Sequence, residues 1–513
     1  MSRINSNTPS MIAQFNLTRS NDNLQVRLNR LATGIRINRG ADDPAGLIIS
    51  ERIGTDINGV AQAIRNGERA SSVISTTEAS LAEVNELLNS IKALVVESAN
   101  TGANSKEERD ANQLQIDSAI RSITRISNTA TFGGLNLLDG SLDYVTSGVT
   151  SSEITKAQVF GASFIGTTQF QVEVDVLNSA QKGALFMEPA TGPLSANGTT
   201  SSVTLQIGGS RGVLEIDFPS GTPFTDIVDA VNSRTSLTGV TAELVNGNAT
   251  SGVVFNAETY GSNSFVSVER VNTPPTGAAP SLFKFGNNES LNATFAFTDT
   301  GLVTANRDNG RDVIALVNGA LANGDGLTIS TNSPILSSTL TLAEGFATDP
   351  TATASTFDII GGGSMYQLGP EVSALQQENI GVQSMAASKL GGTLDNGVMN
   401  FLASLQSGGA NDIETSLQRN DFSTSSDVLD SAIDEVTILR GRLGAFERNV
   451  LDTNRRSLQA AVENLSASRS VIRDADFAVE TSELTRAQIL QSSGTTVLGL
   501  ANQQAQSVLQ LLG

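Results

Sequence analysis

Cysteine, histidine and tryptophan are all absent from this sequence of 513 residues. Without cysteine the chain can form no disulfide bond, no thiolate nucleophile and no thiolate metal site. Without histidine it lacks the side chain that most often transfers protons near neutral pH and most often binds metals. We therefore expect no enzymatic activity, no catalytic residue, no metal site and no cofactor. Aromatic residues make up only 4% of the chain, so its core must consist mainly of small and aliphatic side chains.

Positive charge and long apolar runs are also scarce. The 32 lysine and arginine residues are outnumbered by 52 aspartate and glutamate residues, which gives a formal net charge of -20. Binding to a phosphate backbone requires clustered basic side chains, so nucleic acid is not expected as a partner. No apolar run reaches the ~18 residues of a membrane span. The N-terminal stretch MSRINSNTPSMIAQF also lacks the apolar segment of a secretory signal peptide.

Both ends of the chain carry the apolar spacing of helices. Leu17, Leu24 and Leu31 recur every seven residues, as in a coiled coil. A second stripe begins after Pro44 and predicts one helix of about 55 residues, or roughly 80 Å. Helical spacing returns from Asp427 onward. We expect these two long segments to pack as a rod through Ile49, Ile53, Ile57, Val60, Ile64, Val84, Leu88, Ile91 and Val95 on the N-terminal side and Leu429, Ile433, Val436, Leu443 and Leu465 on the C-terminal side.

Asp43 and Pro44, in the stretch GADDPAGLIISERI, mark the predicted start of the long helix. Aspartate at the N-cap accepts hydrogen bonds from free backbone N–H groups, and proline suits the first helical position because no donor is needed there. A catalytic or metal-binding carboxylate pair is the disfavoured alternative, since no histidine or third carboxylate cluster lies nearby. A third helix is predicted to start at the capping box of Ser105 and Glu108. TFGGLNLLDGS, from Thr131, is then expected to form a hairpin.

The middle of the chain, from about residue 164 to residue 363, changes to short segments that alternate apolar and polar residues. FQVEVDV, from Phe170, is typical of a half-buried strand. DIVDAVN, from Asp226, and DVIALVN, from Asp312, are each expected to form a short helix that leads into a strand. The middle is therefore predicted to hold two α+β modules, at about residues 164–268 and 269–362. The predicted fold class is α + β multidomain, with an antiparallel helical bundle or coiled coil formed by both chain ends and a β-rich inserted middle region.

The C-terminal segment has no charged side chain from Ala487 to Gly513, but six glutamines interrupt its aliphatic residues. A membrane span would not carry so many glutamines together, and a surface helix would carry charge on its outer face. The segment is therefore expected to contact protein on more than one side, with an ordinary buried terminal helix as the simpler alternative. One apolar stripe contains Ala487, Leu490, Val497, Ala501, Ala505, Val508 and Leu512, while Leu498 and Leu500 fall off it.

Four stretches together resemble bacterial flagellin: LNRLATGIRINRGADDPAGLIISERI from Leu28, SANTGAN from Ser98, TFGGLNLLDGS from Thr131 and RAQILQSSGTTVLGLANQQAQSVLQLLG from Arg486. FQVEVDVLNSAQKGAL and the modules after it also resemble the repeat insert of some flagellins and hook-associated proteins. The resemblance implies a structural subunit that polymerises into the hollow filament of the bacterial flagellum, for motility. It places the paired terminal helices inside the filament and the middle of the chain outside.

The resemblance also implies a division of the chain. Residues 1–43 and 474–513 would form an inner tube, residues 44–163 and 363–473 an outer tube with a β-hairpin, and residues 164–362 a variable surface insert. The implied partners are other copies of the chain, an export chaperone, the hook-associated proteins and the filament cap. Export is expected through the flagellar type III channel, without a cleaved signal peptide, to an extracellular filament. The implied inner-core contacts are Leu17, Leu24, Leu28, Leu31, Ile35, Leu490, Val497, Ala501, Ala505, Val508 and Leu512.

Two surface features of the family can be compared with this chain. Flagellins sensed by the animal innate receptor carry L-Q-R-x-R-E-L-A-V-Q, where this chain has LNSIKALVVE. Ser90 and Ala93 replace the arginine and the glutamate of that pattern and Leu94 is kept, so receptor activation is expected to be poor. The tripeptides that begin at Asn197 and Asn292 fit the N-glycan pattern, and O-linked sugars on the insert are an equal alternative.

Rival functions remain open beside the filament subunit. A zinc peptidase in the insert would need H-E-x-x-H, and the chain has no histidine. Hydrolysis by Glu173 and Asp175 is less favoured than a solvated strand face. A hook-filament junction protein shares the terminal helices, and an adhesive insert is compatible with either assignment. The full DDPAGLIIS stretch and the complete C-terminal tail favour flagellin.

Overall fold

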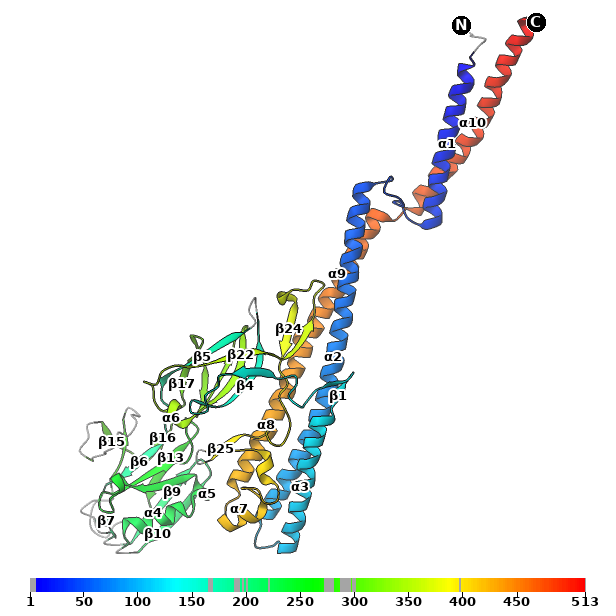
Figure 1. The fold of residues 1–513 in the computed structure, drawn as a ribbon. Coiled ribbons are helices and arrows are strands. Elements are labelled where there is room, and N and C mark those ends of the chain that lie inside the picture. The colour runs from blue at the N-terminus through cyan, green and yellow to red at the C-terminus, as the bar shows by residue number, and fades with distance from the viewer. Residues whose placement is uncertain are drawn as a thin grey trace. The chain divides into compact units, whose positions relative to one another are not determined.

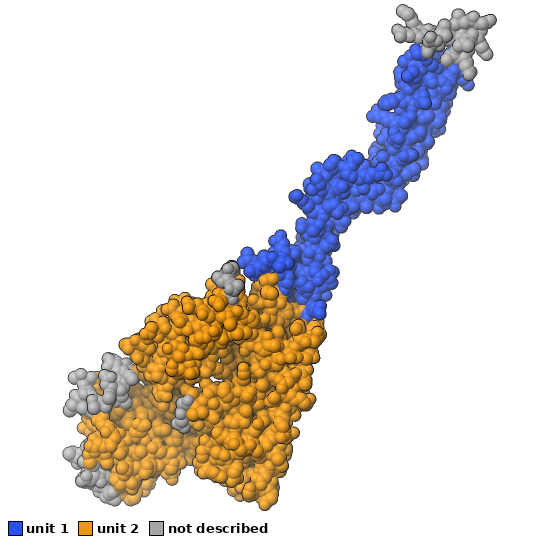
Figure 2. All heavy atoms as spheres, in the orientation of Figure 1, with its two compact units in different colours: residues 1–69, 367–376, 448–513 blue, residues 70–366, 377–447 orange. Residues whose placement is uncertain are grey.

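The computed structural model describes residues 6–164, 169–188, 194–195, 198–199, 202–219, 222–271, 281–286, 297, 301–395 and 398–512. The chain folds into two compact units, each assembled from segments that are distant in sequence. The terminal unit contains residues 1–69, 367–376 and 448–513, and the central unit contains residues 70–366 and 377–447 (Figure 2). Helices at both ends of the chain and strands between them confirm the predicted fold class (Figure 1).

The terminal unit is built from two pairs of helices. Its first and last helices, α1 and α10, lie side by side and run in opposite directions (Figure 1). The N-terminal part of α2 lies beside α9, where Arg473 forms an ion pair of 2.6 Å with Glu51. The bounds are Thr8–Thr33 for α1, Pro44–Ala99 for α2, Glu447–Leu451 for the π-helical turn η4, Asp452–Arg473 for α9 and Phe477–Leu512 for α10.

The two connections between these helix pairs are hydrogen-bonded to each other. Gly34 ends α1 in the left-handed conformation, with φ of 69°, which a residue without Cβ adopts at little cost. The next residue, Ile35, pairs with Asp474 as an isolated β-bridge, and the Arg36 N–H donates to the carbonyl of Arg473 at 2.7 Å. The turn that follows α1 and the turn that precedes α10 therefore lie next to each other.

In the central unit, the C-terminal part of α2 packs with α3 and α8 (Figure 1). Each helix buries aliphatic side chains at steps of three or four residues, and Leu88 of α2, Ile120 of α3 and Val436 of α8 are each 0% exposed. A buried hydrogen bond of 3.2 Å from Asn112 to Ser98 also joins α3 to α2. The bounds are Lys106–Thr129 for α3, Leu402–Leu405 for η3, Ile413–Arg419 for α7 and Ser423–Phe446 for α8.

Short paired strands flank the helices. The turn after Thr131 contains Gly133 and Gly134, whose φ values of 60° and 89° suit the two-residue turn of an antiparallel hairpin. This is the hairpin that the sequence predicts. The bounds of these short strands are Thr131–Phe132 for β1, Leu135–Asn136 for β2, Ser364–Gln367 for β23, Gln377–Ile380 for β24, Thr393–Asp395 for β25 and Val398–Asn400 for β26, with Ala374–Gln376 as the helical turn η2.

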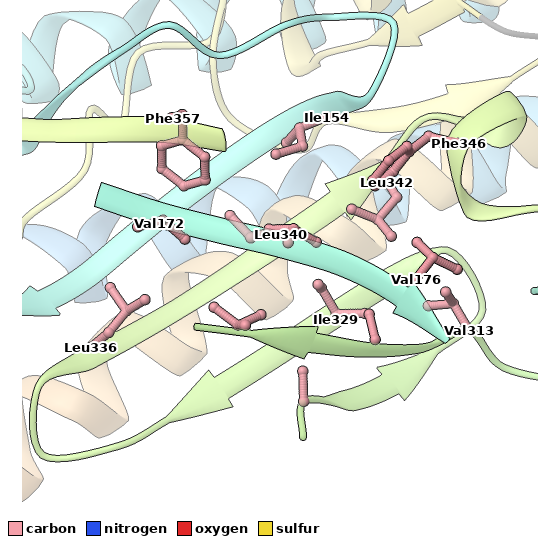
Figure 3. Packing of buried hydrophobic residues seen from close by; sticks show 14 of the residues in the cluster. Ile154, Val172, Val176, Val313, Ile329, Leu336, Leu340, Leu342, Phe346 and Phe357 are labelled. Carbon is pink, nitrogen blue, oxygen red and sulfur yellow. The ribbon is translucent and has the colours of Figure 1, made fainter. Parts of the chain in front are cut away.

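The first β module contains two sheets with strand orders β18-β17-β5-β22-β3 and β19-β20-β21-β4. Side chains from both sheets form one core, in which Val172, Leu340 and Phe357 meet (Figure 3). The bounds are Tyr144–Ser147 for β3, Ile154–Ala162 for β4, Phe170–Asn178 for β5, Ile314–Val317 for β17, Ala320–Leu321 for β18, Asn323–Asp325 for β19, Thr328–Asn332 for β20, Leu336–Leu342 for β21, Glu344–Ala347 for α6 and Ser355–Gly362 for β22.

The second β module also contains two sheets, with strand orders β10-β9-β13-β16 and β11-β12-β6-β14-β15. Helix α4 adds Phe224 and Ile227 to a core that also includes Phe255. The bounds are Ala184–Met187 for β6, Leu194–Ser195 for β7, Gly198–Thr199 for β8, Val203–Gly209 for β9, Val213–Phe218 for β10, Phe224–Asn232 for α4, Thr235–Thr238 for α5, Val240–Leu244 for β11, Val245–Gly247 for η1, Val253–Ala257 for β12, Phe265–Arg270 for β13, Leu282–Phe285 for β14, Leu302–Thr304 for β15 and Arg307–Asn309 for β16.

The helix predicted to start at Asp312 is wrong. DVIALVN, from Asp312, contains strand β17 and no helix. Asn318 and Gly319 both have positive φ, so they turn the chain back at once into β18. Periodicity cannot separate a short apolar run in a strand from one in a helix, and pairing with β5 decides here. The modules are also nested, because the second core lies between residues 180 and 313 of the first, whereas the sequence predicts consecutive modules.

Candidate assembly surface

The side of α10 that faces α1 follows steps of three and four residues. Ala487 is buried there, and Gly494, Leu498 and Ala501 are half-buried. Gly494 permits a close approach, since a Cβ atom added to it would lie 3.2 Å from the side chain of Leu17. α10 therefore contributes mainly small residues to this contact, whereas α1 contributes Leu17, Leu24 and Leu31, each of which stays half-buried.

Polar side chains fix the two helices at the end where the chain begins. The side-chain amide of Asn7 donates a hydrogen bond of 3.1 Å to the carbonyl of Ala501. The Ser10 hydroxyl donates to Asn502 at 2.7 Å. Asn7 is also the N-cap of α1, because its side chain accepts from the Ser10 N–H. One asparagine thus both starts α1 and sets its register against α10.

A buried carboxylate joins the helices at their other end. Glu480 of α10 accepts hydrogen bonds from Arg27 at 2.9 Å and from Arg30 at 3.1 Å, and its side chain is only 6% exposed. Burial alone would raise the pKa of Glu480, but the hydrogen bonds from Arg27 and Arg30 outweigh it and hold the pKa below its usual value. No local pattern indicates this pairing, since the residues lie far apart along the chain.

The opposite sides of both helices carry exposed large apolar side chains among polar ones in the single chain. On α1, Phe15 is 69% exposed, and on α10, Leu500 is 60% exposed. Pro9, Val497 and Leu500 line a shallow open groove between the two helices. The large exposed apolar side chains of the described parts of α1 and α10 are Met11, Ile12, Phe15, Val26, Leu28, Phe477, Val479, Ile489, Leu490, Val497 and Leu500.

The implied inner-core residues divide between the paired side and the bare side. Half-buried in the single chain are Leu17, Leu24, Leu31, Ile35 and Ala501, and exposed are Leu28, Leu490 and Val497. The side chains of Ala505, Val508 and Leu512 lie outside the described residues. Leu498, which the sequence places off the stripe, is on the paired side. Gln491 and Gly494 interrupt the apolar pattern there, so hydropathy alone favours the neighbouring side.

Most of the residues expected to pack the rod are enclosed within their own unit. Ile49 is the exception, at 49% exposed. The expected residues that are buried are Val60, Val84, Leu88, Ile91, Val95, Leu429, Val436 and Leu443, and those that are half-buried are Ile53, Ile57, Ile64, Ile433 and Leu465. The same side of α2 also buries Gly46, Ser50, Gly54, Ile74 and Leu81, and the small residues among them have no hydropathy signal by which the sequence could have revealed them.

Both expected helix starts are capped by side chains. The Asp43 carboxylate accepts from the Gly46 N–H at 2.9 Å, directly before Pro44 opens α2. Ser105 and Glu108 form a reciprocal capping box at the start of α3. The neighbouring Asp42 accepts from two backbone N–H groups, those of residues 38 and 39, and these bonds lower its pKa. Both carboxylates of the DD pair therefore accept hydrogen bonds from nearby backbone N–H groups.

The remaining candidate residues lie on separate surfaces. Ser90 and Ala93 are exposed on α2 and Leu94 is half-buried. On β5, Glu173 is exposed and Asp175 is half-buried. Within the described ranges, no three Asp or Glu side chains gather in a way that could hold a metal ion. None of the described helices combines the length and the apolar character needed to cross a membrane.

Helices with one paired side and one bare apolar side define a class of subunit that completes its packing by association with other chains. Two family profiles match the ends of this chain: the bacterial flagellin N-terminal helical region over residues 4–143 and the bacterial flagellin C-terminal helical region over residues 426–512. The flagellin of Salmonella typhimurium is 30% identical over 99% of both chains, as is the B-type flagellin of Pseudomonas aeruginosa. The chain belongs to the flagellin family. It is a structural subunit of the extracellular flagellar filament, which assembles from copies of itself.

Solved structures resemble this chain only loosely. The flagellar hook associated protein-3 of Legionella pneumophila is 12% identical, covers 82% of this chain and 97% of its own, and has a TM-score of 0.30. The D2-D3 domains of the flagellar cap protein from Escherichia coli are 16% identical, cover 42% of this chain and 97% of their own, and have a TM-score of 0.26. These scores are too low to support an inference about shared contacts.

Proposed function

We propose that the filament forms when the bare sides of α1 and α10 are buried against other copies of the chain. The observation that carries the proposal is that each terminal helix has one side paired within the chain and large apolar side chains left open on the other, with Phe15 and Leu500 among them. A surface helix normally carries polar side chains on its outer side. The open residues therefore need a protein partner, and a copy of the chain supplies one at every position in a filament.

Assembly and folding of the terminal helices are coupled in this proposal. A large apolar side chain contributes about 1.5–3 kcal/mol when it becomes fully buried. In the α1–α10 pair the leucines stay half-buried and the remaining apolar contacts are small, so the pair gains too little of this to offset the entropy of ordering both helices. The terminal helices are thus expected to be largely unfolded in free subunits, and circular dichroism and proteolysis of monomers test this. Termini fully protected in the free subunit would contradict it.

The proposed contacts are heterologous, and they generate an open fibre because they never close into a ring. In this arrangement, residues 1–43 and 474–513 form the inner tube through the inner-core residues named above. Residues 44–163 and 363–473 form the outer tube. Ile49, which is half exposed in the single chain, gains its partner there. Residues 164–362 form the surface insert.

Export and further partners complete the proposal. The chain leaves the cell through the flagellar type III channel without a cleaved signal peptide, bound beforehand by an export chaperone. The hook-associated proteins and the filament cap contact the two ends of the growing filament. Asn197 and Asn292, which fit the N-glycan pattern, lie outside the described residues. The role of the chain in this proposal is structural, without catalysis. The altered patch at Ser90 and Ala93 activates the innate receptor poorly.

The proposal is tested by seeded growth of filaments from purified subunits. Replacing Val497 and Leu500 by serine should raise the critical concentration about a hundredfold, because each side chain then loses its burial in the filament. The matched control is Val213→Ser with Leu237→Ser in the insert, where the side chains are exposed to a similar extent, at 65% and 59%. Equal growth of the V497S/L500S variant and the control would contradict the proposal.

The same assay separates the filament subunit from a hook-filament junction protein. A filament subunit lengthens the seeds in proportion to the amount added, whereas a junction protein caps them and stops growth. If the insert is adhesive, deletion of the second β module should abolish adhesion and leave filament growth unchanged.

A further inference from the structure

The loop over residues 367–376 presents two bare aliphatic side chains. Val372 is 89% exposed and Leu375 is 83% exposed, the highest values among the large apolar side chains of the described residues. Both lie in the terminal unit. Isolated exposed aliphatic residues need no explanation, but these two are only three residues apart in one short loop.

The base of this loop is anchored to the helices of the terminal unit. The side chain of Leu368 is buried, and its carbonyl accepts a hydrogen bond of 2.8 Å from the Asn454 amide. The Asn66 amide of α2 donates to the carbonyl of Gln367 at 3.3 Å. Pro370 packs over Gly59 of α2, where an added Cβ would lie 3.2 Å from the proline ring. The loop is thus attached to the helical surface at three points.

Hydrogen bonds within the loop fix the shape of its tip. The Leu368 N–H donates to the carbonyl of Gln376 at 2.9 Å, and the Gln376 N–H donates to the carbonyl of Ser373 at 3.0 Å. The Gln376 side chain accepts from the Glu371 N–H at 2.7 Å. Val372 and Leu375 are therefore held in their exposed positions before any contact is made, which lowers the entropy that binding would cost.

We propose that the tip at Val372 and Leu375 is a docking knob that packs against an aliphatic surface on a second copy of this chain. The proposal rests on the proposed assembly function and adds a contact to it outside the terminal helices. The knob gives the filament a second, separate point of attachment between copies.

Charge favours a second copy as the occupant. Each copy carries a formal net charge of -20, so two copies repel each other except where uncharged surfaces meet. The tip residues from Val372 to Gln376 carry no charge. An uncharged apolar tip is the kind of surface through which two such acidic chains can approach closely.

The position of the loop in the chain also favours a second copy as the occupant. The loop falls outside both family-matched regions, residues 4–143 and 426–512, but it is anchored to Gly59, Asn66 and Asn454, which lie inside them. It therefore projects from the helical surface that belongs to the filament-forming part of the chain. A knob that packs against a different surface of the next copy makes a heterologous contact, which extends a fibre without closing it.

Photocrosslinking identifies the occupant directly. We would place p-benzoylphenylalanine at position 372 and grow filaments from equal amounts of ¹⁵N-labelled and unlabelled subunits. Crosslinked peptides of mixed isotope content are expected in filaments and not in monomers, since they join two copies. The same probe at position 213 in the insert serves as the control. Crosslinks confined to single copies, or crosslinks only to a different protein in filaments from cells, would overturn the proposal.

A pair of substitutions measures the contribution of the knob. Val372→Ser with Leu375→Ser should raise the critical concentration for seeded growth about tenfold or more, because two side chains lose their burial. The thermal unfolding of the monomer should not change, since both side chains are exposed there. V213S/L237S again serves as the matched control.

The outcomes also separate this proposal from the assembly function itself. Wild-type subunits that fail to grow on seeds would overturn both. Wild-type growth matched by the V372S/L375S variant, without crosslinks between copies, would overturn the docking knob alone.

Discussion

Helix α2 passes through both units, and its two parts bury very different side chains. In the central unit its inner side carries Leu81 and Leu88, each 0% exposed. In the terminal unit the same side buries Gly46, Ser50 and Gly54. The step of three or four residues is the same in both parts, but the buried residues of the terminal part are mostly small, and Val60 is the largest of them. Periodicity thus sets which side of a helix faces inward, while side-chain volume sets how much stability that side supplies.

The partners of α2 differ in the same way. In the central unit α3 and α8 add buried isoleucine, leucine and valine side chains. In the terminal unit α9, which is described in full, has no buried side chain at all. The central unit therefore has a core of large aliphatic side chains, whereas the terminal unit buries few large side chains of its own.

The largest effect is expected from a substitution in the core of the central unit. Leu88→Ala should lower the free energy of unfolding of the subunit by about 2–5 kcal/mol, because it removes a fully buried side chain and leaves a cavity. Leu114→Ala on α3, where the side chain is 66% exposed, is the matched control and should change it by less than about 0.5 kcal/mol. Urea unfolding of monomers followed by circular dichroism measures both. Equal values for the two variants would mean that the central unit lacks an independent core.

A smaller effect is expected in the terminal unit and only in filaments. Glu480→Gln should weaken filaments by about 1–3 kcal/mol per subunit, since Arg27 and Arg30 lose their buried anionic partner. Glu483→Gln is the control, because its oxygen lies 3.7 Å from Arg486 in a more exposed pair. Thermal depolymerisation of filaments measures the difference. A matching loss in free monomers would contradict the view that the terminal helices fold on assembly.

The same glutamate predicts a dependence on pH. The pKa of Glu480 is lowered in the folded state from its ordinary value of 4.5. Its contribution is therefore present above pH 4.5 and is lost as the pH falls through the lower, folded value. Wild-type filaments should lose this part of their stability in acid, and E480Q filaments should not. Parallel acid titrations of the two filaments would contradict the assignment.

The smallest effect compares two helix glycines. Gly441→Ala in α8 should stabilise the monomer by about 0.5–1 kcal/mol, because alanine favours the helix and a Cβ there would meet no atom within 4 Å. Gly494→Ala in α10 should stabilise the protein by less than this, or should weaken the filament, since its Cβ would lie 3.2 Å from Leu17. Differential scanning calorimetry of monomers and filaments measures the pair. A gain at Gly494 equal to that at Gly441 would show that α1 and α10 do not pack closely in the filament.

Much of the helical architecture could be predicted because its signals are local. Asp43 with Pro44, and Ser105 with Glu108, mark helix starts within a few residues of chain. Leu88 and Ile91 lie on a continuous apolar stripe. Strand β17 could not be predicted in this way, because its short apolar run fits a helix equally well until pairing with β5 is known. The nested order of the two β modules likewise depends on which strands pair.

The candidate assembly surface was predicted only in part. The uncharged tail after Arg486 indicates contacts on several sides, but the main apolar stripe leaves out Leu498, whose side chain is half-buried on the side that faces α1. Gly494 shows why: a glycine carries no hydropathy signal, and its role is visible only when Leu17 lies against it. Glu480 with Arg27 and Arg30 was missed because a charged residue in a sequence is most simply read as solvated.

The sequence by itself determined the helical ends, the β-rich middle, the helix caps and the family, since each is encoded by neighbouring residues or by a recognisable stretch. Only the tertiary structure decided which side of α10 packs against α1 and which strands form each core. It also decided that the Glu480 carboxylate pairs with Arg27 and Arg30 and which aliphatic side chains remain exposed. These features depend on contacts between residues far apart in the chain, and spacing along the sequence carries no information about such distances.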